Sequence, residues 1–331
     1  MSQPGYIALF HSGELKQRLE RLEVRLSFCD ICPRKCGVNR LACETGFCHS
    51  GYRPIVVTVC AHHGEEPVLS GNRGSGTIFF GNCNMRCVYC QNYQISQNWE
   101  NQKINEVDCD ILAKKMIYLQ DELGCHNINF VSPMHFVPQI MRAVLVAIPL
   151  GLKIPLVYNT NGYDSVDTLK ELDGIISIYL PDLRYANNQF AEEFSQVSYY
   201  VEQSREVIKE MYRQVGDLII GKSGIAQQGL IVRHLVLPNG LAGSKDSLGW
   251  LAREISSKVS VSIMSQYLPL YLAQQIPVLA RKISVAEYGE VMELVDKLGL
   301  ENGWLQKMGS AENYAPNFEQ ENNPFSINAD K

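Results

Sequence analysis

Apolar runs alternate with amphipathic stretches along residues 76–298, and this pattern constrains the fold of the chain of 331 residues more than any other feature. The short apolar runs predict strands at 77–82, 128–132, 155–159, 175–180, 230–236 and 259–264. Helical stretches lie between or after them, at about 107–123, 136–149, 165–172, 190–215, 246–257 and 284–298. Strands that alternate with helices form parallel β-α units, and their crossovers are right-handed. The sequence therefore predicts an α/β fold, in which six units curl into a partial (β/α)6 barrel.

A cysteine motif directly follows the first predicted strand. Cys83, Cys87 and Cys90 have the spacing C-x3-C-x2-C. Three thiolates can bind three irons of a four-iron cluster and leave the fourth iron open to an outside molecule, whereas electron-transfer clusters usually have four protein thiolates. Zinc is the alternative, since it normally takes four protein ligands and His62 or His63 could supply the fourth. The position at the C-terminal end of a strand, where α/β proteins build their sites, favours the cluster.

The strand, this motif and the Tyr-Cys-Gln-Asn run at 89–92 resemble the cluster-binding loop of the radical S-adenosylmethionine (SAM) superfamily. The likeness is greatest to a branch related to the activating enzyme of pyruvate formate-lyase. It extends through the segments 64–67, 159–162, 181–184 and 233–238. The resemblance implies an oxidoreductase or activase in which a [4Fe-4S] cluster reductively cleaves SAM to a 5′-deoxyadenosyl radical that abstracts hydrogen. It also implies an external one-electron reductant of the flavodoxin or ferredoxin type.

Polar and aromatic residues at the strand ends are the candidates for holding SAM. Arg184 stands where the activating enzymes have Lys, and Asn159 stands where they have Asp. Arg233 lies inside an otherwise apolar strand, so it should face the barrel interior and needs a partner. Gln266 and Tyr267, after the sixth strand, are weaker candidates for substrate contact. The predicted SAM-binding residues are Tyr89, Asn92, Ser132, Asn159, Asn161, Asp182, Arg184 and Arg233. Their alternative roles are packing, turn formation and helix capping.

A second group of cysteines lies near the N-terminus. Cys29, Cys32, Cys36 and Cys48 would make a site of four thiolates, which leaves Cys43 spare. Both tetrahedral zinc and an iron–sulfur cluster accept four thiolates, so the sequence predicts a second metal site without fixing the metal. Unliganded thiols are the third alternative. The turn at 62–67, which follows this segment, either seals it against the barrel or forms a wall of the substrate pocket.

The composition and the ends of the chain limit the partners. A net charge of −5 and the lack of a basic run argue against nucleic acid. No apolar run reaches the about eighteen residues of a membrane span, and the first residues lack the features of a signal peptide. We therefore expect a cytoplasmic metalloprotein with no membrane partner. Its predicted parts are a cysteine-rich metal-binding module at 1–75, the radical SAM barrel at 76–270, and a C-terminal part at 271–331 that holds a helix and, over 313–331, a loose tail.

Several functions remain open at this stage. One is a glycyl-radical activase, which would need a wide open face because its substrate is a loop of a partner protein. Another is hydrogen abstraction from a small molecule or from a side chain of another protein, and the small molecule would need a closed pocket. The non-enzymatic alternative is an iron–sulfur electron-transfer protein, whose cluster would not respond to SAM.

Overall fold

The structure, a computed structural model, describes residues 3–309, 315–320 and 323–325. Its centre is one sheet with the strand order β1-β2-β3-β4-β5-β7-β8-β9, in which β6 (Ile219–Ile220) pairs with β7. The six predicted strands are parallel neighbours in this sheet: β2 (Ser75–Phe80), β3 (Ile128–Val131), β4 (Leu156–Thr160), β5 (Ile178–Pro181), β7 (Ala226–Leu235) and β8 (Ser260–Met264). Most of these strands are buried throughout, as expected of parallel strands covered on both faces.

The barrel is open. β1 (Val56–His62) runs antiparallel to β2 at one end of the sheet, and β9 (Gly303–Leu305) runs parallel to β8 at the other. Within the described residues these two end strands do not pair with each other. The prediction of an α/β fold with an incomplete barrel is therefore confirmed. The sheet extends beyond the part predicted as the barrel, 76–270, because β1 lies before residue 76 and β9 lies after residue 270.

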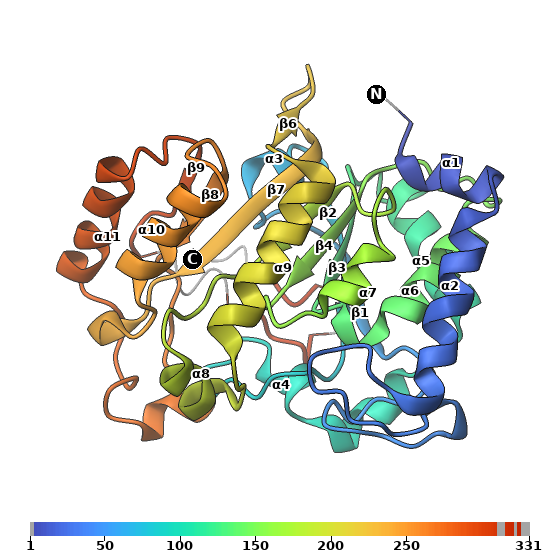
Figure 1. Ribbon diagram of the computed structural model, residues 1–331, viewed down its shortest axis with the longest axis horizontal. Coiled ribbons are helices and arrows are strands. Elements are labelled where there is room, and N and C mark those ends of the chain that lie inside the picture. The colour runs from blue at the N-terminus through green and yellow to red at the C-terminus, as the bar shows by residue number, and fades with distance from the viewer. Residues whose placement is uncertain (1–2, 310–314, 321–322, 326–331) are drawn as a thin grey trace.

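Helices cover the outside of the sheet (Figure 1). The main ones are α5 (Cys109–Asp121), α6 (Val137–Ala147), α7 (Val166–Lys170), α8 (Asn188–Ser195), α9 (Tyr200–Val215), α10 (Ser244–Glu254) and α11 (Val285–Lys297). Two short helices are α3 (Pro67–Ser70) and α4 (Tyr93–Ser96), and 3-10 turns lie at Arg25–Phe28, Arg40–Ala42, Trp99–Asn105, Met134–Phe136, Pro238–Gly240 and Ala273–Gln275. The single helix predicted over 190–215 is wrong, because Gln196 and Tyr199 adopt positive φ angles of 52° and 56° and separate α8 from α9.

Two N-terminal helices pack on the barrel before the cysteine-rich segment begins. These are α1 (Gly5–His11) and α2 (Glu14–Val24), and α2 runs beside α6 (Figure 1). Arg142 on α6 forms an ion pair with Glu23 on α2 at 2.5 Å. No helix in the described part of the chain is long and apolar enough to cross a membrane.

The described part of the C-terminal tail contacts the sheet. The ring of Phe325 lies 4.0 Å from the ring of His62 and 5.8 Å from that of Phe79, and Phe318 packs edge-on against Phe79. The predicted loose tail spans 313–331, and much of it lies outside the described residues.

Candidate active site

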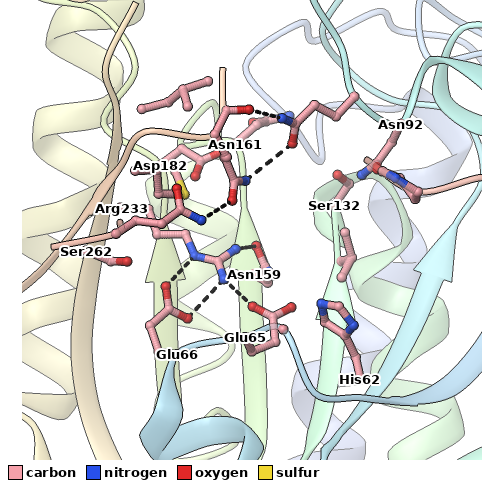
Figure 2. A pocket seen from close by; sticks show the side chains of 18 of the residues that line it. His62, Glu65, Glu66, Asn92, Ser132, Asn159, Asn161, Asp182, Arg233 and Ser262 are labelled. Atoms are coloured by element: carbon pink, nitrogen blue, oxygen red, sulfur yellow. Dashed lines mark hydrogen bonds and ion pairs between the residues drawn. The ribbon is translucent and has the colours of Figure 1, made fainter. Parts of the chain in front are cut away.

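A cavity of about 460 Å³ opens at the C-terminal ends of the parallel strands. All eight predicted SAM-binding residues line it, although they come from five different strand ends. Figure 2 labels all of them except Tyr89 and Arg184. Tyr89 and Asn92 follow β2, Ser132 follows β3, Asn159 and Asn161 come from the end of β4, Asp182 and Arg184 follow β5, and Arg233 lies on β7. The carboxyl ends of neighbouring parallel strands meet at one edge of a sheet, and this is why a dispersed set converges here.

The cysteine loop forms part of this site. Cys90 lines the cavity, whereas Cys83 and Cys87 are buried beside it. Each sulfur has a polar side chain next to it: Asn161 Nδ2 donates to Cys83 Sγ at 3.4 Å, Ser195 Oγ donates to Cys87 Sγ at 3.1 Å, and Ser96 Oγ lies 3.2 Å from Cys90 Sγ. Hydrogen bonds to sulfur are among the interactions that tune iron–sulfur centres. The sequence analysis missed both serines, since neither belongs to a motif.

Two of the three thiols of this loop, those of Cys83 and Cys90, have a raised pKa, which favours their protonated form when no metal is bound. Burial raises the pKa of Cys90 to about 12, and the neighbouring Cys87 and Cys83 contribute in the same direction. Burial also raises the pKa of Cys83, with a further contribution from Cys87. Because the thiolate is the metal ligand, cluster assembly at this site must release protons.

Arg184 joins the cysteine loop to the cavity. Its Nη2 donates to Asp182 Oδ2 at 2.5 Å, and its Nη1 lies 3.7 Å from Cys87 Sγ. Burial works to lower the pKa of Arg184, but the charges of Asp182 and Cys87 outweigh it and keep the pKa above its ordinary value. The buried Nε has no hydrogen-bond partner among the described residues. A cationic donor without a partner, in the wall of a cavity, suits an anionic group of a ligand.

Arg233 has protein partners. Its Nε and Nη2 donate to the two carboxylate oxygens of Glu66 at 2.8 Å and 2.9 Å, and Nη2 also contacts Glu65 (Figure 2). Asn159 Oδ1 accepts a weaker bond from Nη1 at 3.4 Å. The expected partner of this buried charge is thus the 62–67 turn, which itself lines the cavity through His62, Glu65 and Glu66. Of its two predicted roles, the structure supports that of a pocket wall.

The other predicted residues differ in how free they are to meet a ligand. The amide of Asn161 is bound on both sides, because Nδ2 also donates to Asn84 Oδ1 at 2.8 Å and Oδ1 accepts from the Tyr163 backbone. Tyr89 donates its hydroxyl to Tyr185 at 2.5 Å. Ser132 has a positive φ of 56°, a conformation that a non-glycine residue adopts only when its surroundings impose it.

The weaker candidates after β8 have separate outcomes. Gln266 lines the cavity. Tyr267 is 1% exposed and donates its hydroxyl to the Leu279 carbonyl at 2.8 Å, so the expectation that it faces the open end is wrong. Sequence analysis also missed three aromatic residues of the cavity wall, Phe79, Trp304 and Phe325.

The N-terminal cysteines lie close to one another. Burial raises the pKa of Cys32, and the neighbouring Cys48, Cys29 and Cys36 raise it further. These are the four residues of the predicted second metal site, and the exposed Cys43 does not contribute. Within the part of the chain that the structure describes, no three His, Cys, Asp or Glu side chains are arranged as ligands of a single metal ion. Metal binding by either thiol group is therefore a proposal.

Comparison with known proteins identifies the class of protein. The model of the radical SAM superfamily matches residues 77–225. The uncharacterized protein MJ0674 of Methanocaldococcus jannaschii is 31% identical over 276 residues, which cover 82% of this chain and 75% of that protein. The chain belongs to the radical SAM superfamily, so the resemblance seen in its sequence is confirmed at that level.

Two solved structures are similar at low identity. HydG, a maturase of the [FeFe]-hydrogenase, is 13% identical with a TM-score of 0.45, over 69% of this chain and 50% of HydG. TYW1 with a lysine-pyruvate adduct bound is 11% identical with a TM-score of 0.42, over 67% of this chain and 73% of TYW1.

Membership of the superfamily implies a [4Fe-4S] cluster and SAM, and the residues present fit both. Three neighbouring thiols carry polar contacts on their sulfurs, and one of them lines a cavity within the size range of small-molecule sites. The unpartnered buried Nε of Arg184 supplies a donor for an anionic group in the same wall.

Proposed function

We propose that this protein holds a [4Fe-4S] cluster through Cys83, Cys87 and Cys90, binds SAM in the adjoining cavity, and abstracts hydrogen from a substrate that enters the same cavity. The observation that carries this proposal is the convergence of eight residues from five strand ends on one cavity that also contains Cys90. When bound, the reduced cluster supplies the electron that cleaves SAM to methionine and a 5′-deoxyadenosyl radical. The protein has to hold the cofactor, keep solvent away and position the substrate.

Arg184 and Asp182 are best placed to hold the methionine part of SAM. The guanidinium donates from Nη2 to Asp182, and its buried Nε, which has no partner among the described residues, can donate to the SAM carboxylate. Tyr89, with its ring in the cavity wall, would pack beside adenine, and Ser132 and Asn92 supply further polar groups. Asn161 acts on the cysteine loop, since its amide nitrogen already donates to Cys83 Sγ and to Asn84 Oδ1.

The remaining residues of the cavity wall would contact the substrate. They combine aromatic rings with a chain of amides, in which Gln306 Nε2 donates to Gln266 Oε1 at 2.8 Å and Gln266 Nε2 donates to Gln91 Oε1 at 3.3 Å. SAM would take part of the 460 Å³, so the remaining space suits a small molecule or one side chain of another protein. A glycyl-radical activase of the oxidoreductase class is the second candidate, and the Asn-Thr-Asn-Gly turn at 159–162 in the cavity wall supports it.

The first test is anaerobic reconstitution with iron and sulfide, followed by electron paramagnetic resonance (EPR) of the reduced protein with and without SAM. We expect SAM to change the cluster signal and 5′-deoxyadenosine to appear. Cys87→Ala should lose both effects, whereas Cys109→Ala, which removes a buried thiol from the start of α5, should keep them. A signal that ignores SAM, with no cleavage product, would instead identify an electron-transfer protein.

The two candidate substrates are separated by a fractionation. Cell extract is divided into small molecules and proteins, and each fraction is added to the reduced enzyme with SAM. Stimulation of 5′-deoxyadenosine formation by the small-molecule fraction supports the first candidate. Stimulation by the protein fraction alone, with a glycyl-radical signal in the product, supports the activase.

A further inference from the structure

Two arginines interlock the two groups of cysteines. Arg34 lies between Cys32 and Cys36 in the sequence, and its Nε donates to the backbone carbonyl of Asn84, the residue after Cys83, at 3.0 Å. Through this hydrogen bond, a side chain from the N-terminal cysteine segment holds the loop at 83–90.

The second arginine makes the reciprocal contact. Arg86 lies between Cys83 and Cys87, and its Nη2 donates to the carbonyl of Phe47, the residue before Cys48. Its Nη1 donates to the Cys83 carbonyl at 2.7 Å.

Both guanidiniums stack on one ring. Arg34 Cζ lies 3.6 Å and Arg86 Cζ lies 4.4 Å from the centre of the Phe47 ring. A cation over an aromatic face is attracted by the ring quadrupole, so Phe47 fixes two positive charges between the thiol groups.

A single arginine side chain therefore spans the gap between the N-terminal cysteine segment and the loop at 83–90.

We propose that Cys29, Cys32, Cys36 and Cys48 hold an iron–sulfur cluster that delivers single electrons to the cluster at Cys83, Cys87 and Cys90. This inference rests on the proposed function, because that function needs an electron from outside for each cleavage of SAM.

The exposure of the thiols gives the direction of transfer. Cys36 is exposed, although Cys29, Cys32 and Cys48 are buried, so a protein donor can approach the N-terminal group through Cys36. In the loop, Cys83 and Cys87 are buried, and the half-buried Cys90 faces the cavity that SAM would fill. Electron tunnelling weakens steeply with distance, and an intermediate site one side chain away shortens the path. In each transfer the external donor loses one electron, the N-terminal site gains it and passes it on, and no bond forms or breaks.

The arginines would act on the energetics of this transfer. Clusters bound by thiolates carry negative charge, and reduction adds to it. Two fixed cations between the sites stabilise the reduced form of each cluster. Arg34 and Arg86 are thus positioning residues for electron transfer as well as links between two segments of the chain.

The test compares two exposed cysteines of the same segment. Cys36→Ser removes one proposed ligand, and Cys43→Ser is the matched control outside the group of four. We expect the reconstituted wild type to hold about eight irons per chain and Cys36→Ser about four, with one EPR signal lost and the SAM-responsive signal kept. In Cys36→Ser, the rate at which flavodoxin hydroquinone reduces the remaining cluster, measured by rapid mixing, should fall at least about tenfold. The rate in Cys43→Ser should match that of the wild type.

The outcomes separate this inference from the proposed function. Zinc at the N-terminal group, or an unchanged reduction rate after its cluster is lost, would overturn the electron-delivery role while leaving a SAM-responsive cluster in place. A wild type without any SAM-responsive signal would overturn the proposed function first.

A second pair of variants tests the arginines. Arg34→Gln should lower the midpoint potential of both clusters in an EPR-monitored redox titration, and Arg34→Lys, which keeps the charge, should restore most of it. Equal potentials in Arg34→Gln and the wild type, with equal iron content, would limit this residue to holding the segment in place.

Discussion

The buried ion pair in the cavity wall makes a prediction about stability. Arg233→Met should destabilise the protein and reverse the contribution of this site to its pH dependence. The side chain of Arg233 is 15% exposed, and those of Glu65 and Glu66 are 6% and 4% exposed. Removing the cation leaves two neighbouring carboxylates in the barrel with no countercharge, while methionine retains much of the apolar stem.

The magnitude follows from the burial and from the sign of the pKa shift. Removing one partner of a buried ion pair costs about 3–5 kcal/mol. In the wild type, burial raises the pKa of Glu66, but the charge and hydrogen bonds of Arg233 outweigh it and hold the pKa below its usual value. That carboxylate therefore stabilises the fold above about pH 4.5, and its contribution is lost as the pH falls through the lowered pKa.

The variant should behave in the opposite way. Without Arg233, burial is the largest influence on Glu66 and raises its pKa above the unfolded value, while the hydrogen bonds from Ser262 and the backbone oppose the rise. The carboxyl of Glu66 then favours the folded state at low pH, and this contribution is lost as the pH rises through the raised pKa. The loss relative to the wild type should thus be larger at about pH 8 than at about pH 5.5.

Urea unfolding of the reconstituted protein at both pH values, followed by circular dichroism, measures this difference. Glu66→Gln is the comparison, because it keeps an acceptor and leaves Arg233 paired with Glu65. We expect this variant to cost less than Arg233→Met and to show no gain on acidification. Equal losses at both pH values for Arg233→Met would refute the reasoning from unpaired buried charge.

Three further predictions concern single contacts. Gly162→Ala should cost at least about 2 kcal/mol in urea unfolding, because Gly162 has a φ of +80° and a Cβ would lie 2.3 Å from the Asp182 carbonyl oxygen; a loss under about 0.5 kcal/mol would contradict this. Asn161→Ala removes the donor to Cys83 Sγ and should lower the midpoint potential of the cluster, measured by redox titration. Burial lowers the pKa of His234 to about 4, so its stabilisation is present above the unfolded pKa of about 6.5 and is lost as the pH falls toward 4; His234→Gln should flatten the pH dependence of unfolding in that window.

The fold was largely predictable because its signals are local. Each buried strand is a short apolar run, and the cysteine motif follows the first of them. The elements that the sequence analysis missed have either a weak local sequence pattern or a clear pattern that the analysis did not use. The break between α8 and α9 uses Gln196 and Tyr199 in place of glycine, and β9 has only three residues. In α2 the signal is present as a buried stripe of leucines, Leu15, Leu19 and Leu22, and the sequence analysis passed over it.

The sequence predicted where the site residues lie in the fold but not which partners they contact. Strand topology determines which residues reach the cavity, so the residues at the strand ends could be identified without knowing their contacts. Their partners depend on segments far apart in the chain. Glu66 meets Arg233 across 167 residues, and Ser195 meets Cys87 across 108. No spacing rule relates such pairs, and only the folded chain shows them.

These contacts divide the predicted SAM-binding residues into two kinds. In the first kind the polar groups have protein partners: Asn161 donates to the cysteine loop, Arg233 donates to the 62–67 turn, and Tyr89 donates its hydroxyl to Tyr185. A side chain whose donors are already occupied within the protein cannot donate to a ligand without breaking a buried hydrogen bond. Arg184 differs, because its buried Nε has no partner among the described residues, while Asp182 holds the other end of its guanidinium. Changes at Arg184 should therefore weaken SAM binding, whereas changes at Asn161 should act on the cluster. We therefore propose that the residues that resemble a single binding motif in the sequence have two separable tasks in the fold.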